Sequence, residues 1–178
     1  SRGLGDVYKR QVLDMVFDLE SMGQCALAAR LLEQFGKYHT HTTMTLYTLA
    51  YLRRKQGMDY EETLRLADAA EIRDTYPARL AEIRVLTFAR EQNAVKAPFL
   101  LGCLLYDKKQ ADAAIAHWEA TVQQDPGQAL VHRNLAIARY NKQGDADAAL
   151  REMEQARRLD PGYPRLLLEY DQLAARLG

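Results

Sequence analysis

Apolar residues recur along this chain at intervals of three and four positions, in segments separated by turn residues. Leu27, Leu31 and Phe35 share one helical face, and Leu46 and Leu49 share another. This spacing is typical of amphipathic α-helices that bury one side against a neighbour. The pattern continues through most of the sequence. We therefore expect an all-α protein of about ten helices.

The helical pattern repeats in the C-terminal half of the chain. Tyr106 and Tyr140 lie 34 residues apart, whereas Trp118 and Met153 lie 35 apart. The offset grows by one because the turn that follows Tyr140 holds one residue more than the turn that follows Tyr106. A single-residue insertion between two helices explains the change, and the repeating unit is then a helix, a turn and a helix.

A helix-turn-helix unit of about 34 residues resembles the tetratricopeptide repeat (TPR). The positions that match its pattern in the two units are Leu101, Gly102, Leu105, Ala114, Trp118, Asp125 and Pro126, and then Leu135, Ala136, Tyr140, Ala149, Met153, Ala156, Asp160 and Pro161. Small residues in this pattern let helices approach closely, while Trp118 and Met153 fill the space between them. The resemblance implies a right-handed α-solenoid of stacked TPR units.

The remaining sequence divides around these two units. Gly23 and Gly57 lie 34 residues apart, and each is expected in the turn between paired helices. We expect two degenerate TPR-like helix pairs over residues 12–73, an unpaired linking helix over 74–94, two well-matched TPR units over 95–161 and a capping helix over 162–178. Residues 1–11 lack the apolar periodicity and look like a translated junction from the end of a gene fragment. We expect that segment to be a sequencing artefact or disordered.

A narrower resemblance rests on three segments, at residues 76–83, 101–108 and 133–135. They look like one bacterial group in which a large β-rich domain of unknown function, similar to galactose mutarotases, precedes a C-terminal TPR array. The resemblance covers roughly residues 12–178. It implies that the chain is a fragment, the array without the domain that acts on or binds carbohydrate.

The charge balance bears on the class of partner. Lys and Arg together number 24, as do Asp and Glu, so the formal net charge is zero. The long-range field that draws a protein to nucleic acid or anionic lipid is therefore missing. The longest uncharged stretches, such as residues 97–106, are far shorter than the ~20 apolar residues that span a bilayer. We expect a cytoplasmic chain that binds neither nucleic acid nor membrane.

No catalytic centre, metal or cofactor is expected. The sequence lacks the glycine-rich phosphate motifs and the GxSxG elbow of hydrolases. Cys25 and Cys103 lie among apolar neighbours without CxxC spacing, as small core residues do. His39 and His41 form the one close histidine pair, in a predicted loop without a carboxylate or cysteine to complete a metal shell. A solvated loop is favoured there, and a metal-dependent enzyme built on this pair is the competing hypothesis.

The first helix of each TPR unit lines the concave side of the solenoid. The inward positions of the family, carried over to this sequence, define a candidate binding groove: Tyr47, Tyr51, Arg54, Lys55, Phe99, Tyr106, Asp107, Arg133, Asn134, Tyr140 and Asn141. Tyrosine, arginine and asparagine suit binding because they combine contact area with directional hydrogen bonds. Tyr106 and Tyr140 also match a position that packs within the repeat, so both roles stay open. His132 either lines the groove or is a structural histidine.

Two functions follow from this reading. The favoured hypothesis is a non-catalytic scaffold or protein-interaction module that binds a protein, a peptide or a neighbouring domain, including an upstream domain of its own chain. The alternative is the accessory C-terminal region of a carbohydrate-active or carbohydrate-binding enzyme whose active site lies upstream. The carboxylate clamp of chaperone-binding TPR proteins resembles this chain only at Asn134, which argues against a cochaperone.

Overall fold

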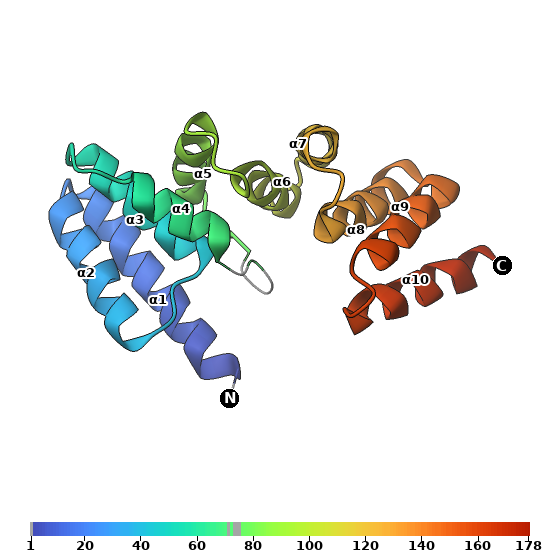
Figure 1. The fold of residues 1–178 in the computed structure, drawn as a ribbon, viewed down its shortest axis with the longest axis horizontal. Helices are drawn as coiled ribbons and strands as arrows, with labels where there is room; N and C mark the ends of the chain where they lie inside the picture. Colours follow the sequence, from blue (N-terminus) through green and yellow to red (C-terminus); the bar gives the residue numbers. More distant parts are fainter. Residues whose placement is uncertain (1, 71, 73–75) are drawn as a thin grey trace. The chain divides into compact units, whose positions relative to one another are not determined.

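The computed structural model describes residues 2–70, 72 and 76–178, which form helices joined by turns and loops (Figure 1). The α-helices are α1 (Arg2–Ser21), α2 (Cys25–Tyr38), α3 (Thr43–Lys55), α4 (Glu61–Ala69), α5 (Glu82–Glu91), α6 (Ala97–Asp107), α7 (Ala111–Gln124), α8 (Ala129–Ala138), α9 (Ala146–Leu159) and α10 (Pro164–Leu177). A π-helical turn, η1 (Arg139–Gln143), continues α8. Ten α-helices and no strand in the described part of the chain confirm the predicted fold class.

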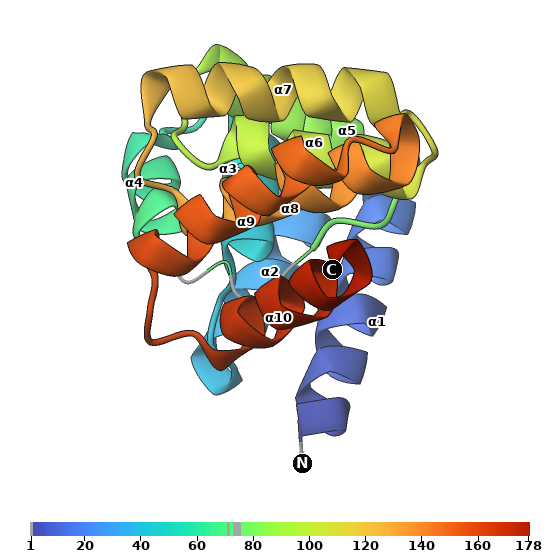
Figure 2. The same ribbon diagram turned by 90° about the vertical axis from the view of Figure 1, so that its right-hand side faces the viewer.

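The chain forms two compact units, residues 1–100 and 101–178, whose boundary falls inside α6. In the first unit α1 packs on α2, α2 on α3, and α3 on both α4 and α5. In the second unit α7, α8, α9 and α10 pack on one another in chain order, and Figure 2 shows the last three side by side. Each unit therefore stacks helices that are close in sequence.

Residues in the left-handed conformation form the turns within the helix pairs. Gly23 has a φ of 76° between α1 and α2, and Gly57 a φ of 68° between α3 and α4, where the sequence placed these turns. Lys109 and Gly144, with φ values of 64° and 63°, take the same place in the second unit. Glycine adopts this conformation without a steric penalty, which explains its use at three of these four turns.

The extra residue of the last repeat lies in η1. α6 ends at Asp107 and the chain reaches Lys109 two residues later, whereas α8 continues through η1 before Gly144 closes the turn. A π-helical turn accommodates one residue more than an α-helical turn. The predicted insertion is therefore part of the helix end, not of the loop.

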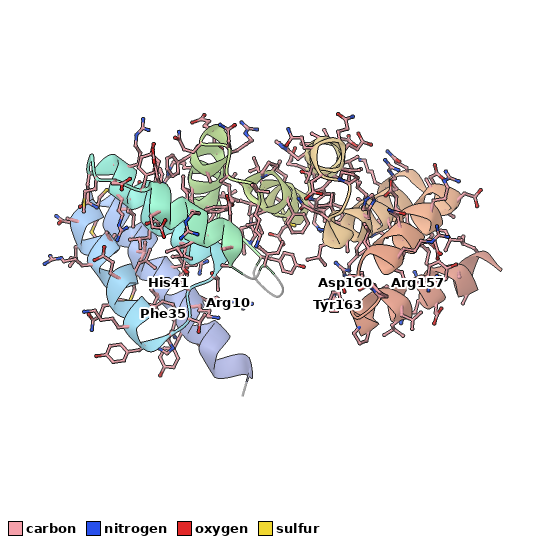
Figure 3. The ribbon with its side chains drawn as sticks, in the orientation of Figure 1. Arg10, Phe35, His41, Arg157, Asp160 and Tyr163 are labelled. Atoms are coloured by element: carbon pink, nitrogen blue, oxygen red, sulfur yellow. The ribbon has the colours of Figure 1, made fainter. Side chains whose placement is uncertain are left out.

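The N-terminal segment differs from the expected disorder. Residues 2–11 belong to α1. The Arg79 guanidinium donates a hydrogen bond of 2.7 Å to the backbone carbonyl of Arg10, which Figure 3 labels, and pairs with Asp14 at 2.5 Å. These contacts connect the middle of α1 to the segment before α5.

Large side chains fill the second unit opposite small ones. Trp118 is 2% exposed, and a Cβ added to Gly102 would lie only 2.8 Å from its Cδ1 atom. In the next repeat Met153 packs in one core cluster with Ala136 and Ala149. Among the described helices, none combines the length and apolarity needed to cross a bilayer.

Candidate binding site

A cavity of about 250 Å³ lies in the second unit, where α8 and η1 meet α9 and α10. Its lining residues are Ala136, Ile137, Tyr140, Asn141, Met153, Glu169, Gln172, Leu173 and Arg176. Apolar side chains combined with a few polar groups are typical of binding sites. The volume is below the ~300–1,000 Å³ of small-molecule pockets, which suits a single inserted side chain.

The core of the unit explains the apolar part of this lining. Ala136, Ala149, Met153 and Leu173 form a buried cluster, and Tyr140 packs against it while remaining partly exposed. Alanine on α8 and on α9 lets the two helices approach closely. The cavity is thus the open side of a packed core, with walls set by α8, η1, α9 and α10.

Glu169 of α10 is held by two arginines. It receives two hydrogen bonds from Arg133, at 2.6 and 2.8 Å, and one from Arg165 at 2.9 Å. Burial alone would raise the pKa of Glu169, but the bonds from the two arginines outweigh it and hold the pKa below its ordinary value. Glu169 belongs to the helix that the sequence predicted as a cap over residues 162–178. The ion pair between Arg133 and Glu169 links α8 to α10.

A chain of polar contacts continues from Arg133 into the core. Arg133 donates to Asn134 Oδ1 at 3.1 Å, and the Asn134 amide lies 3.4 Å from the Sγ atom of Cys103. Burial raises the pKa of the Cys103 thiol to about 12, so the thiol stays protonated at neutral pH. Cys103 and Cys25 are both free. A protonated, largely buried thiol is a poor nucleophile.

The second-unit groove residues take different roles. Tyr140 and Asn141 line the cavity. Asn141 donates to the hydroxyl of Tyr106 at 3.2 Å, while the ring of Tyr106 packs on Trp118 with centroids 5.7 Å apart. Asp107 is exposed and pairs with the adjacent Lys108. The structure therefore brings two of the predicted residues to the cavity, and Tyr106 and Arg133 contact the lining residues Asn141 and Glu169.

The first-unit groove residues separate into two sets. Tyr51, Arg54 and Lys55 are accessible along α3. Tyr51 and Lys55 donate to the buried Glu20, whereas Arg54 donates to the Tyr60 hydroxyl. Tyr47 and Phe99 are fully buried. Such burial does not fit a place on an accessible groove.

Tyr47 is a packing residue because α3 is surrounded by α2, α4 and α5. Its hydroxyl donates to Asp68 at 2.5 Å and accepts from the backbone N–H of Lys96 at 3.2 Å. Burial, together with Asp68, raises the pKa of the Tyr47 phenol.

Sequence reasoning missed several polar groups at these sites: Glu20, Arg84, Glu169, Gln172 and Arg176. The sequence did hold a signal for Glu20, because this residue continues the apolar stripe of Leu13, Val16 and Phe17. In the structure Glu20 is only 6% exposed. A charge on the buried face of a helix marks a paired group. Arg84 and Arg176 sit among many other surface arginines and carried no such signal.

Both rings of the histidine pair pack against Phe35, His39 stacked on it with centroids 4.8 Å apart and His41 edge-on with centroids 5.9 Å apart. His41 lies over Gly36, with Nδ1 3.0 Å from the Thr45 hydroxyl, and burial lowers its pKa (Figure 3). In the part of the chain that the structure describes, no three histidine, cysteine or acidic side chains are grouped as metal ligands.

No family model matches this sequence. Two solved structures of MamA align with it: one, the protein from Desulfovibrio magneticus RS-1 beginning at residue 41, is 18% identical over 94% of this chain and 84% of that chain, with a TM-score of 0.50. The RS-1 ArsTM double mutant of MamA gives the same identity and TM-score over 94% and 83% of the two chains.

A further match, YrrB, is described as a TPR protein with an unusual peptide-binding site, and it is 19% identical over 90% of this chain and 73% of that chain with a TM-score of 0.48. The matches give no support to the expected relation with proteins that carry a mutarotase-like domain. Structural similarity at such low sequence identity shows a shared fold and nothing more. The fold of this chain is that of the helical TPR solenoids.

Proposed function

We propose that the chain is a protein-interaction module that binds a peptide or a segment of a neighbouring protein at the cavity between η1, α9 and α10. The cavity carries this proposal because its apolar lining is open to an incoming side chain and bordered by an amide pair, Asn141 and Gln172, and by one cation, Arg176. TPR architecture provides extended surfaces of this kind. The chemistry of the lining supports it independently.

The lining indicates what kind of contact the site makes. An apolar side chain would bury its surface against Ile137, Met153 and Leu173. The side-chain amides of Asn141 and Gln172 both donate and accept hydrogen bonds, as the backbone of an extended peptide requires. One inserted anchor with polar contacts around it is the usual form of an interface hot spot.

The titratable groups beside the cavity favour binding over chemistry. Both carboxylate oxygens of Glu169 accept from arginines, and its lowered pKa makes it a weak base. The Cys103 thiol is protonated at neutral pH. A general base or nucleophile needs a group that is free to exchange a proton, and neither residue provides one.

The test uses peptides selected from a random displayed library on the whole chain. Asn141→Ala and Arg176→Ala should each weaken the selected peptides by about tenfold or more, or ~1.4 kcal/mol, as measured by isothermal titration calorimetry. Both side chains lie at the solvent-exposed border of the cavity, so helicity should not change.

Lys142→Ala and Asp171→Ala serve as matched controls. Both residues are exposed, each neighbours a lining residue in sequence, and neither lines the cavity. Selected peptides that bind all four variants as they bind the wild type would rule out the cavity as the binding site.

A further inference from the structure

The first unit contains a buried carboxylate with two exposed cations. Glu20, near the end of α1, accepts hydrogen bonds from Lys55 Nζ at 2.7 Å, from Arg84 at 2.8 Å and from the Tyr51 hydroxyl at 3.3 Å. The three donors come from α3 and α5. The Glu20 side chain is 5% exposed, whereas Lys55 is 39% and Arg84 is 54% exposed.

The cluster has an excess of positive charge. Burial alone would raise the pKa of Glu20, but hydrogen bonds from Lys55 and Arg84 and their charges lower it, so the carboxylate is ionised. One negative charge then faces two positive ones. Arg54, exposed on the same helix as Lys55, adds a third cation. The excess is local, because the whole chain has no net charge.

Hydrogen-bond donors remain for a second acceptor. An ammonium group has three donors and a guanidinium has five. Glu20 uses one donor of Lys55 and one of Arg84. Since both side chains reach the same carboxylate, their remaining donors lie within the span of a second one. A carboxylate is one of the groups that such a pair binds strongly.

Aromatic rings extend this surface from Lys55 to Arg54. Tyr51 and Tyr60 both pack on Phe88, with centroids 5.9 and 5.3 Å away. Lys55 lies over the ring of Tyr51 at 5.5 Å, and Arg54 over the ring of Tyr60 at 5.9 Å. The cations thus cover the ring faces on which nucleic-acid bases would stack, which disfavours a single-stranded nucleic acid.

We propose that this basic face, defined by Tyr51, Arg54, Lys55, Tyr60 and Arg84, binds an acidic segment of a partner protein, with one Asp or Glu carboxylate bridging Lys55 and Arg84. Cations stand at both ends of the aromatic group, so the face suits a run of carboxylates better than one small anion. The aromatic edges between them accept the apolar stems of the acidic side chains. The inference does not depend on the cavity of the second unit.

A hexaglutamate peptide is the probe, with hexaglutamine as the uncharged comparison. Calorimetry at low salt should detect binding of hexaglutamate but not of hexaglutamine. Added salt should weaken the binding of hexaglutamate. Arg84→Gln and Lys55→Gln should each reduce the affinity by about fivefold to tenfold. Either variant leaves Glu20 with one cation, and circular dichroism checks that helicity is kept.

Arg90→Gln is the matched control, since Arg90 is exposed on the same helix as Arg84 and the variant loses the same charge. Glu20→Gln removes the competing carboxylate and should strengthen binding, which provides a test that needs no loss of affinity. The cavity variants Asn141→Ala and Arg176→Ala should bind hexaglutamate normally, so the two proposals can fail separately.

Three results would overturn the proposal that the basic face binds an acidic segment. Equal losses for Arg84→Gln and Arg90→Gln would show unspecific attraction. Unchanged or weaker binding by folded Glu20→Gln would show that the carboxylate does not compete with the peptide. Tighter binding of an oligothymidylate than of hexaglutamate, with the same sensitivity to Arg84→Gln, would assign the face to nucleic acid instead.

Discussion

At the scale of single residues, Gly102 sets how closely α6 can approach Trp118. A side chain at this position would occupy the place of the indole ring. The next repeat has Ala136 at the equivalent position, packed in a cluster with the more adaptable Met153. The two repeats therefore use different pairs of a small and a large residue, Gly102 with Trp118 and Ala136 with Met153. Both pairs fill the space between the helices.

Gly102→Ala should destabilise the protein by about 1–3 kcal/mol because the new Cβ overlaps Trp118. The gain in helix propensity, about 0.5–1 kcal/mol, opposes this loss but is smaller. Urea unfolding followed by the fluorescence of Trp118, the one tryptophan of the sequence, measures the change. Gly162→Ala is the control, since its Cβ would meet the nearest atom at 3.9 Å. Equal midpoints for the two variants would contradict the close approach.

The residues of the core were easier to predict from the sequence than those of the site. Gly102, Trp118, Ala149 and Met153 recur at the repeat interval, and all four are buried. A binding residue has no such regularity, because its partner is absent from the sequence. Tyr47 illustrates the difference: its helical position suggested a groove, but packing by α4 and α5 buried it.

At the scale of elements, His132 connects α8 to its neighbours. Its Nδ1 atom lies 2.7 Å from a Glu152 oxygen on α9, and its Nε2 atom 2.9 Å from the Pro126 carbonyl before α8. Both partners are acceptors, so both ring nitrogens must donate and the imidazole is positively charged. Hydrogen bonding to Glu152 raises the pKa of His132 above its ordinary value, although burial and Arg139 oppose the rise.

The His132 contacts should make stability depend on pH with a defined sign. The folded-state pKa exceeds the unfolded value of about 6.5, so the stabilisation is complete below that pH and is lost as the pH rises through the folded-state pKa. Hydrogen bonds to charged groups contribute about 1.5–3 kcal/mol. The free energy of unfolding of the wild type should exceed that of His132→Gln by the largest amount at acidic pH. This difference should shrink in alkaline buffer. Chemical unfolding across this range measures it.

His39, His41 and His117 are present in both proteins of that comparison, so the difference between the curves reports on position 132. Glu152→Gln should also remove much of the pH dependence, because it removes the first cause of the raised pKa. If the wild-type and His132→Gln curves run parallel across the range, folding does not change the pKa of His132, which would contradict its charged contacts.

Element boundaries followed from the sequence where backbone chemistry is specific. Gly23 and Gly57 marked the first two inter-helix turns, and both have positive φ. Lys109 and Asn93 also adopt positive φ, but neither is glycine, so the pattern alone did not identify the conformation at these positions. The helical state of residues 2–11 was missed because local periodicity is weak there.

At the scale of the whole molecule, the chain consists of two units with separate packing. Repeat proteins gain stability from interactions between neighbouring helices, so a local defect spreads over a limited distance. The repeat spacing predicted the helix order, but it did not predict where packing divides the chain. That division depends on the number of interhelical contacts on either side of Leu100, which the repeat interval does not encode.

Met153→Ala should destabilise the second unit more than the first. The cavity left by this buried side chain costs about 2–5 kcal/mol. Hydrogen exchange should show faster opening of α8, α9 and α10, with α1 to α4 nearly unchanged. Leu32→Ala in the first unit is the reciprocal variant, because Leu32 is equally buried. Uniform acceleration across all helices would show that the two units open together.

The π-helical turn η1 lets the last repeat be one residue longer without changing which side chains of α9 face α8. One residue added inside an α-helix rotates every later side chain by about 100° around the axis. Here the wider turn takes up that rotation, and Ala149 and Met153 still meet Ala136. The same five residues include Tyr140 and Asn141 at the cavity. Variation in the length of this segment can therefore reshape the cavity while the helices behind it keep their alignment.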